Sequence, residues 1–120
     1  MIIEGGSNIE IAKAAIHQLL TQPHHPTALF SANNLMTIGS ILALREEHLS
    51  IPDQMVLAGF DDFEWADFFT PRLSLVAQPV ATIAVKAIQM LLERIKDPER
   101  IPQTLRLKPT IHIRNSCGCL

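Results

Sequence analysis

The sequence predicts a layered α/β fold with a largely parallel sheet, and three observations lead to this prediction. Short apolar runs without strict alternation recur along the chain, as in strands buried on both faces of a parallel sheet. Segments with apolar residues at steps of three and four lie between these runs, as in helices with one buried face. Turn-forming residues separate the segments. With 120 residues, the chain has room for one hydrophobic core and not for two independent ones.

The first predicted elements are a short strand at residues 2–3 and a helix that begins near Ser7. Ser7 and Glu10 have the spacing of a capping box, in which a hydroxyl and a carboxylate satisfy the first backbone amides of a helix. An apolar stripe at helical spacing follows, and the prolines within residues 23–26 end the helix. The stripe consists of Ile9, Ala12, Ile16, Leu19 and Leu20.

The remaining elements repeat the alternation of strand and helix. Asn33 or Asn34 is suited to cap a second helix, and Gln78-Pro79 opens a long third one that stops before Pro98. The segment between residues 61 and 70 is irregular and rich in aromatic side chains. Strands are predicted at residues 27–31, 55–60 and 73–77, all with the composition of buried strands, and at residues 104–108 and 110–113, which alternate polar and apolar.

Composition and charge exclude several classes of function. The net charge of −2 argues against nucleic-acid binding by this part of the chain. No apolar run reaches membrane-spanning length and no secretory signal is present, so we expect a cytoplasmic protein without a membrane partner. Cys117 and Cys119 are too close for an unstrained disulfide, and we expect reduced thiols, with neither a metal nor a cofactor. The charge is uneven, with nine acidic and two basic residues up to Thr70, and three acidic and eight basic residues after Pro71.

An enzyme is not supported by the sequence. Four carboxylates cluster between Asp61 and Asp67, but no basic or nucleophilic residue has a recognisable spacing around them. Phosphate loops, dinucleotide fingerprints and nucleophile elbows are missing. Trp65 and the pair Phe68-Phe69 suit a core, a sugar-stacking platform or a subunit contact.

Polar side chains follow three of the predicted strands directly: Asn33, Asp61 and Gln78. If the strands are parallel neighbours, these side chains converge at one edge of the sheet, where ligands bind in open α/β folds. An amide, a carboxylate and a second amide offer donors and acceptors together, which suits hydroxyl-rich ligands such as sugars. The alternative is that Asn33 only caps its helix and Asp61 only ends its strand.

Seven short stretches extend over nearly the whole chain: PTALFSANNLM at residues 26–36, ALRE at 43–46, LSIPD at 49–53, LAGFDD at 57–62, TPRLS at 70–74, QP at 78–79 and IRNS at 113–116. Each stretch alone is a weak signal. Together, in this order and with this spacing, they are specific and resemble the lactose/galactose repressor (LacI/GalR) family of transcriptional regulators.

The resemblance implies a fold of periplasmic-binding-protein type (type I), with an effector, usually a sugar or a nucleobase, held between two α/β subdomains. Residues 1–77 would form part of the C-terminal subdomain, residues 78–109 would supply a helix and a strand of the N-terminal subdomain, and residues 110–120 would return. The effector-contacting positions of the family fall on Asn33, Asp61 and Gln78.

The resemblance also implies homodimerisation, at Leu35, Ile38, Phe68 and Phe69. Possible further effector contacts are Ser7, Asn34 and Trp65. Asn34 stands where the family usually has an aspartate. Ser7 lies near a position that often carries a stacking aromatic residue, and Trp65 is a possible substitute for that stacking.

DNA would be read only through an N-terminal helix-turn-helix that this sequence lacks. The fragment is therefore expected to expose apolar surface, to self-associate, and to bind effector weakly or not at all. The leading interpretation is the effector-binding and dimerisation part of a repressor. A solute-binding protein of a sugar transport system and a standalone dimerisation module with a vestigial pocket are the alternatives.

Overall fold

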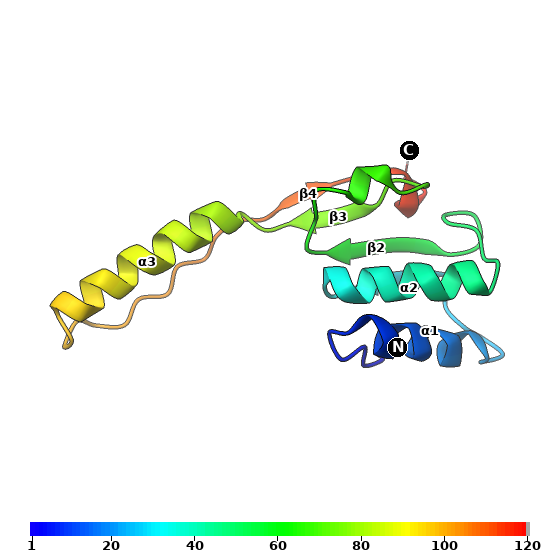
Figure 1. Cartoon of the computed structure of the whole chain (residues 1–120), viewed down its shortest axis with the longest axis horizontal. Helices are drawn as coiled ribbons and strands as arrows, with labels where there is room; N and C mark the ends of the chain where they lie inside the picture. The colour runs from blue at the N-terminus through cyan, green and yellow to red at the C-terminus, as the bar shows by residue number, and fades with distance from the viewer. Residues whose placement is uncertain (120) are drawn as a thin grey trace. The chain divides into compact units, whose positions relative to one another are not determined.

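A computed structural model describes residues 1–119, which divide into two compact units. The first unit comprises Met1–Ala77 together with the segment from Ile111 onward, and the second comprises Gln78–Thr110. Figure 1 labels the three α-helices and the strands β2, β3 and β4. The helices are α1 (Ile9–Leu20), α2 (Asn34–Glu46) and α3 (Val80–Lys96), and the strands are β1 (Ala28–Ser31), β2 (Val56–Phe60), β3 (Ser74–Ala77) and β4 (Thr110–His112), with short 3₁₀ helices η1 (Ala66–Phe68) and η2 (Asn115–Cys117). None of the helices within residues 1–119 is long and apolar enough to cross a membrane.

The four strands form one sheet in the order β1-β2-β3-β4. β1 pairs in parallel with β2, placing Ser31 opposite Gly59, and β2 pairs in parallel with β3, placing Phe60 opposite Val76. The carboxyl ends of these three strands therefore lie at the same edge of the sheet. This arrangement confirms the predicted α/β class with a largely parallel sheet.

Helix α1 begins one residue later than a capping box at Ser7 would require. Asn8 is the N-cap, and its side-chain oxygen accepts hydrogen bonds from the backbone amides of Glu10 and Ile11 at 2.9 and 3.2 Å. Ser7 instead has a positive φ of 48° in the preceding turn. The prediction was wrong because Glu10 lies only two residues after the true cap and cannot reach back to close the box. The predicted stripe is confirmed at its centre, where Ala12, Ile16 and Leu19 are buried.

Helix α2 packs closely against α1 because a glycine lies at their contact. A Cβ atom at Gly39 would lie 2.5 Å from the carbonyl oxygen of Ile9 and 2.8 Å from the Cβ of Ala12. Both distances are too short for any side chain, so the two helix backbones approach here as only glycine permits. Because the two helices are this close, the apolar side chains of α1 pack directly against α2.

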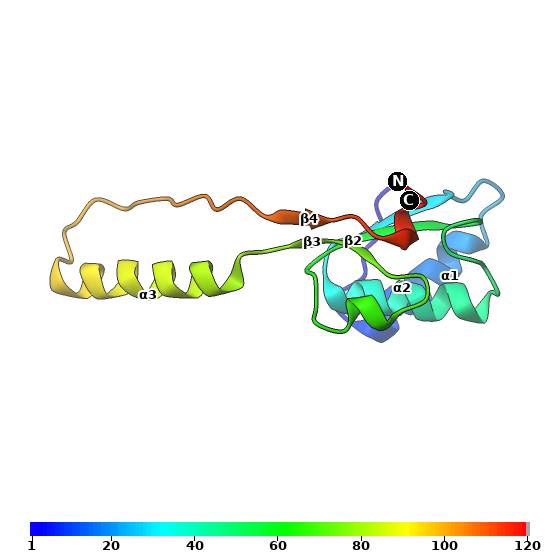
Figure 2. The same ribbon diagram turned by 90° about the horizontal axis from the view of Figure 1, so that it is seen from above.

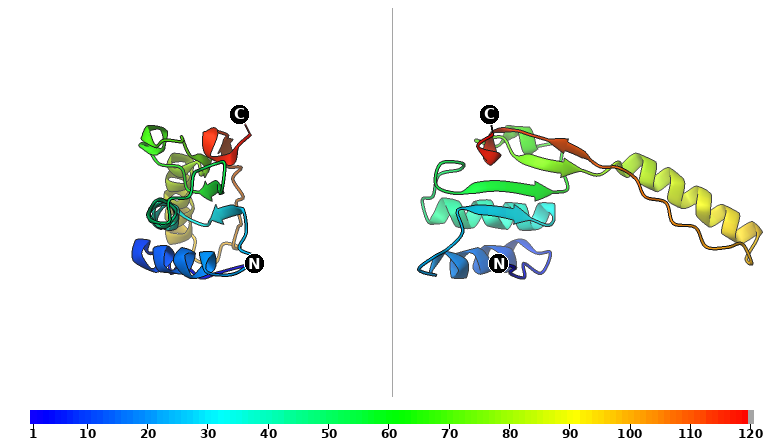
Figure 3. Two further views of the ribbon diagram at one scale, coloured as in Figure 1. Left: turned by 90° about the vertical axis from the view of Figure 1, so that its right-hand side faces the viewer. Right: turned by 180° about the vertical axis from the view of Figure 1, so that it is seen from behind.

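Two clusters of buried side chains form the core of the first unit. One lies between α1, α2 and the start of β2, and the other lies between α2, β2, β3 and η1. The first contains Ile16, Leu19, Ala43, Leu44 and Met55, and the second contains Ile41, Leu57, Ala66, Leu73 and Leu75. Both clusters depend on α2, which lies against one face of the sheet (Figure 3).

Strand β1 is not buried on both faces, contrary to the prediction. Ser31 is buried and Leu29 is half-buried, whereas Phe30 keeps 64% of its surface exposed. Alternate side chains of a strand point to opposite faces, and β1 is an edge strand whose covered face is the one toward α2. Residues 2–3 were predicted as a strand but have no strand assignment, because no neighbouring strand pairs with them within the described residues.

The second unit consists of α3 and an extended segment that runs back along it (Figure 2). Arg94 donates hydrogen bonds to the carbonyl oxygens of Pro98 and Arg100, and Arg100 pairs with Glu93 at 3.0 Å. Residues 104–108 were predicted as a strand, but they lack a partner strand in the described part of this unit and form none. None of the described side chains of α3 is buried.

Candidate functional site

Asn33 follows β1 and serves as the N-cap of α2. Its Oδ1 accepts a hydrogen bond from the backbone amide of Met36 at 2.9 Å, and its carbonyl accepts from the amide and the hydroxyl of Thr37 at 3.0 and 2.9 Å. The cap fixes the side chain at the carboxyl end of β1 and uses its acceptor oxygen. Among the described contacts the Nδ2 group makes no hydrogen bond, so Asn33 offers donors to a ligand.

Asp61 follows β2 and lies beside β3. Its backbone amide donates to the carbonyl oxygen of Val76 at 2.9 Å, and the amide of Asp62 donates to the same oxygen at 3.2 Å. Asp61 is half-buried and has a positive φ of 71°. Because Ser31 is opposite Gly59 in the ladder, the structure brings Asn33 and Asp61 to neighbouring strand ends.

Gln78 follows β3 directly and is the first residue of the second unit. It is exposed, and its carbonyl accepts a hydrogen bond from the amide of Val80 at 2.9 Å at the start of α3. The chain therefore passes from one unit to the other at this predicted effector contact.

The three secondary candidates lie in different environments. Ser7 is exposed in the turn before α1, and Asn34 is exposed at the start of α2, where its Oδ1 accepts from the amide of Leu35 at 2.8 Å. Trp65 is half exposed and packs on Phe63 and Phe69, with ring centroids 4.6 and 5.8 Å apart.

Trp65 also lines a hollow of about 770 Å³ with side chains from the last turns of α2 and the loop after it. This hollow lies toward the opposite end of α2 from Asn33, the residue that caps its first turn. Trp65 and Asn33 therefore belong to different ends of the unit.

The residues predicted at a dimer interface are exposed or half-buried in the single chain. Phe68 keeps 86% of its surface exposed and Leu35 is also exposed, while Ile38 and Phe69 are half-buried. Phe68 and Phe69 both line the same hollow as Trp65. The exposed ring of Phe68 and the hollow beside it together form an apolar surface of the kind that suits a protein contact.

The acidic cluster after β2 has a basic partner that the sequence did not reveal. Arg114 donates to both carboxylate oxygens of Asp62, from Nη1 to Oδ1 at 3.2 Å and from Nη2 to Oδ2 at 2.9 Å. Its Nε lies 2.7 Å from Oδ1 of Asp67. His112 adds a contact from Nδ1 to Oδ2 of Asp62 at 2.5 Å. No basic residue lies at a recognisable spacing from this cluster in the sequence, and both partners come from the C-terminal segment.

These partners are more than 40 residues away along the chain, which is why local spacing could not find them. The one available signal was the uneven charge, with acidic residues before Pro71 and basic residues after it. Burial raises the pKa of Asp62, but the hydrogen bonds from Arg114 and His112 outweigh it and hold the pKa below its usual value. Asp62 is therefore held as a carboxylate.

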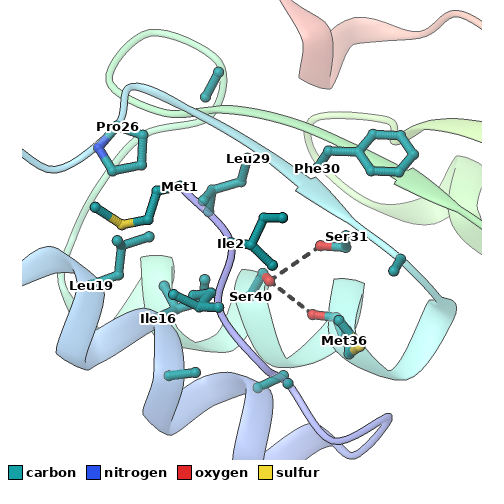
Figure 4. A pocket seen from close by; sticks show the side chains of 16 residues that line it. Met1, Ile2, Ile16, Leu19, Pro26, Leu29, Phe30, Ser31, Met36 and Ser40 are labelled. Carbon is teal, nitrogen blue, oxygen red and sulfur yellow. Dashed lines mark hydrogen bonds between the residues drawn. The ribbon is translucent and has the colours of Figure 1, made fainter.

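A cavity of about 500 Å³ lies between α1, β1 and the first residues of the chain (Figure 4). Its walls are mainly apolar, with Ile2, Ile16 and Leu29 among them. Its two hydroxyls are already engaged, because Ser40 donates to the carbonyl of Met36 at 2.8 Å and lies 3.3 Å from the hydroxyl of Ser31. The cavity therefore lacks the convergent polar groups that a sugar requires.

Metal-binding geometry does not occur in the part of the chain that the structure describes, where no three His, Cys, Asp or Glu side chains come together. Cys117 and Cys119 are free thiols.

Comparison with known proteins identifies the fold and the family. Residues 3–117 match the periplasmic binding protein-like domain. The ribose operon repressor of Haemophilus influenzae is 36% identical over 115 residues, which cover 96% of this chain and 35% of that protein. The HTH-type transcriptional repressor PurR of Yersinia pestis is also 36% identical, over 96% of this chain and 34% of its own length. The chain thus spans about a third of the curated relatives it matches, and those relatives are transcriptional regulators.

Solved structures agree with this assignment. A LacI family transcriptional regulator from Enterococcus faecium, solved with bound ribose, superposes with a TM-score of 0.78 at 26% identity, over 91% of this chain and 40% of that one. The chain belongs to the periplasmic binding protein-like domain family and is a partial effector-binding domain of the LacI type.

Proposed function

We propose that this chain binds a small hydroxyl-rich effector, a sugar, at the carboxyl ends of its parallel strands, as part of a cytoplasmic LacI-type repressor. The observation that supports this most is the placement of Asn33 and Asp61 at the neighbouring ends of β1 and β2. Asn33 supplies amide donors and Asp61 supplies carboxylate acceptors, so one sugar hydroxyl can accept from the first and donate to the second. Gln78, which follows the third strand, is the third proposed contact.

Ribose is the probe of choice, because one structural relative was solved with ribose bound and one curated relative is a ribose operon repressor. The experiment is a ribose titration of the isotope-labelled chain, followed through its backbone amide signals by NMR. Amides at residues 33, 61 and 78 are expected to shift together and to saturate. NMR detects dissociation constants in the millimolar range, about −4 kcal/mol of binding free energy, so weak binding by this partial domain is still measurable.

The substitutions can be matched to the geometry. Asn33→Asp keeps an oxygen that caps Met36 but removes the amide donors, so α2 should stay capped while ribose binding weakens. Asp61→Asn should weaken binding about tenfold, the effect of losing one charged hydrogen bond. Asp53→Asn is the control, because Asp53 lies exposed in the turn before β2. Equal ribose affinity for all three variants would contradict the proposed site.

Homodimerisation through Leu35, Ile38, Phe68 and Phe69 is the second part of the proposal. The exposure of Phe68 and the hollow beside it support a protein contact there. Sedimentation of the wild type should show a concentration-dependent dimer or larger species, and Phe68→Ser should shift it toward the monomer. A solute-binding protein is the competing function, but the relatives reported above are repressors.

A further inference from the structure

The carboxylate of Asp62, next to the proposed effector ligand Asp61, is held by several hydrogen bonds. Asp62 has 10% of its side chain exposed and accepts hydrogen bonds from Arg114 at both oxygens. Its Oδ1 also accepts from the backbone amide of Phe63 at 3.0 Å. A guanidinium group matches a carboxylate in this two-pronged geometry, which fixes direction as well as distance.

Arg114 is itself anchored on the sheet. Its Nη1 donates to the carbonyl of Leu73 at 2.7 Å, and its backbone amide donates to the hydroxyl of Ser74 at 2.8 Å. Two residues later, the buried hydroxyl of Ser116 donates to the carbonyl of Leu57 at 2.6 Å and accepts from the amide of Ser74 at 2.8 Å. The contacts of Arg114 with Leu73 and Ser74 fix the guanidinium beside β3, and the guanidinium in turn fixes Asp62.

Asp61 needs such support because its backbone conformation is unfavourable. A φ of 71° lies in the left-handed region, which aspartate tolerates better than most residues but which persists only where the surroundings hold it. On one side it is held by the hydrogen bonds that the amides of residues 61 and 62 donate to Val76. On the other side, the following residue is held by Arg114.

We propose that Arg114 is a positioning residue for effector binding: it never touches the effector but, by gripping Asp62, holds Asp61 in the orientation that binds it. This inference rests on the proposed role of Asp61. A lysine could supply the charge but not the parallel hydrogen bonds, so the geometry requires arginine. Asp67 is more exposed and is the second carboxylate partner of the same guanidinium, at its Nε.

The test compares Arg114→Met and Arg114→Lys with Ser116→Ala in the full chain. Ser116→Ala removes two buried hydrogen bonds of the same C-terminal segment but keeps Arg114 and its own contacts with Leu73, Ser74 and Asp62, so it controls for loss of stability. Ribose affinity is measured by NMR titration well below the melting temperature of every variant. Both Arg114 variants should bind ribose about tenfold more weakly than Ser116→Ala does. Affinities that fall in proportion to melting temperature across all three variants would overturn the inference.

A second readout keeps the inference testable without ribose. Amide hydrogen exchange at Asp61 and Asp62 reports whether their hydrogen bonds to Val76 open locally. Arg114→Met should speed exchange at these two amides and leave the amides in the middle of α1 unchanged. If the wild type fails to bind ribose, the proposed function fails, and the positioning role is then decided by exchange alone. Unchanged exchange at both amides would overturn it.

Discussion

Gly39 controls how closely the first two helices of this chain can pack, and replacing it with alanine sets two opposing effects against each other. Alanine is favoured over glycine inside a helix by about 1 kcal/mol. The added Cβ would, however, lie 2.5 Å from the carbonyl oxygen of Ile9, 2.8 Å from the Cβ of Ala12 and 3.1 Å from the amide nitrogen of Lys13. Two of these three atoms belong to the backbone of α1, so they cannot move without moving the helix.

Relieving the clash must push α1 away from α2. The displacement would loosen the cluster in which Ile16 and Leu19 contact Ala43, Leu44 and Met55. Overpacking of this kind costs about 1–3 kcal/mol and more where backbone must shift, so it should exceed the gain in helix propensity. We expect Gly39→Ala to destabilise the chain by about 1–2 kcal/mol and to lower its melting temperature by roughly 4–8 °C.

Thermal and urea denaturation followed by circular dichroism measure this effect. Ala14→Gly is the matched control, because Ala14 is exposed on α1 and its replacement should cost only the helix propensity, about 1 kcal/mol. Raised stability in Gly39→Ala, by about the same amount that Ala14→Gly loses, would show that no steric limit exists at the helix contact and would refute the reasoning.

Three further predictions concern how the stability of the chain depends on pH and on buried hydrogen bonds. Hydrogen bonds to Glu46 and Glu47 raise the pKa of His17 above 6.5, so this contact stabilises the fold below that pH and is lost as pH rises through the raised pKa. The urea midpoint of the wild type should therefore fall relative to His17→Gln between mildly acidic and alkaline pH; identical profiles would argue against it. Asp62 has a lowered pKa, so its contribution is present above the usual value and is lost as pH falls through the lowered one, and Asp62→Asn should flatten the acid limb of the unfolding profile. Ser116→Ala leaves two buried backbone groups unsatisfied and should cost about 1–3 kcal/mol, whereas a negligible change in urea midpoint would mean that water replaces the hydroxyl.

Local patterns in the sequence were sufficient to predict the helices and most strands. The apolar stripe of α1 depends only on helical periodicity, and its central residues are buried as expected. The N-cap was misplaced by one residue because Ser7 and Asn8 are both good caps, and the choice between them depends on the preceding turn. The strand at residues 104–108 was wrong for a different reason: alternation describes a strand only when a partner is present to pair with it.

The candidate site likewise contains residues that could be predicted from the sequence and residues that could not. Asn33 and Asp61 could be named in advance because each follows a strand, and parallel strands bring their carboxyl ends together. Arg114 and His112 could not, because their contact with Asp62 forms only when the C-terminal segment returns to β3. Charge balance along the chain was a signal that the acidic segment would meet basic residues from downstream, but it did not say which ones.

The structural role of Asn33 as a helix cap is compatible with a second role in binding a ligand. A cap alone requires only an acceptor oxygen, and asparagine, aspartate and serine supply one about equally well. Asparagine differs from the other two by its amide donors, which the cap does not use. Asp61 holds its strand end through its backbone amide at a positive φ of 71°. At Asn33 the part of the side chain that the cap does not use is the part that a sugar hydroxyl would engage.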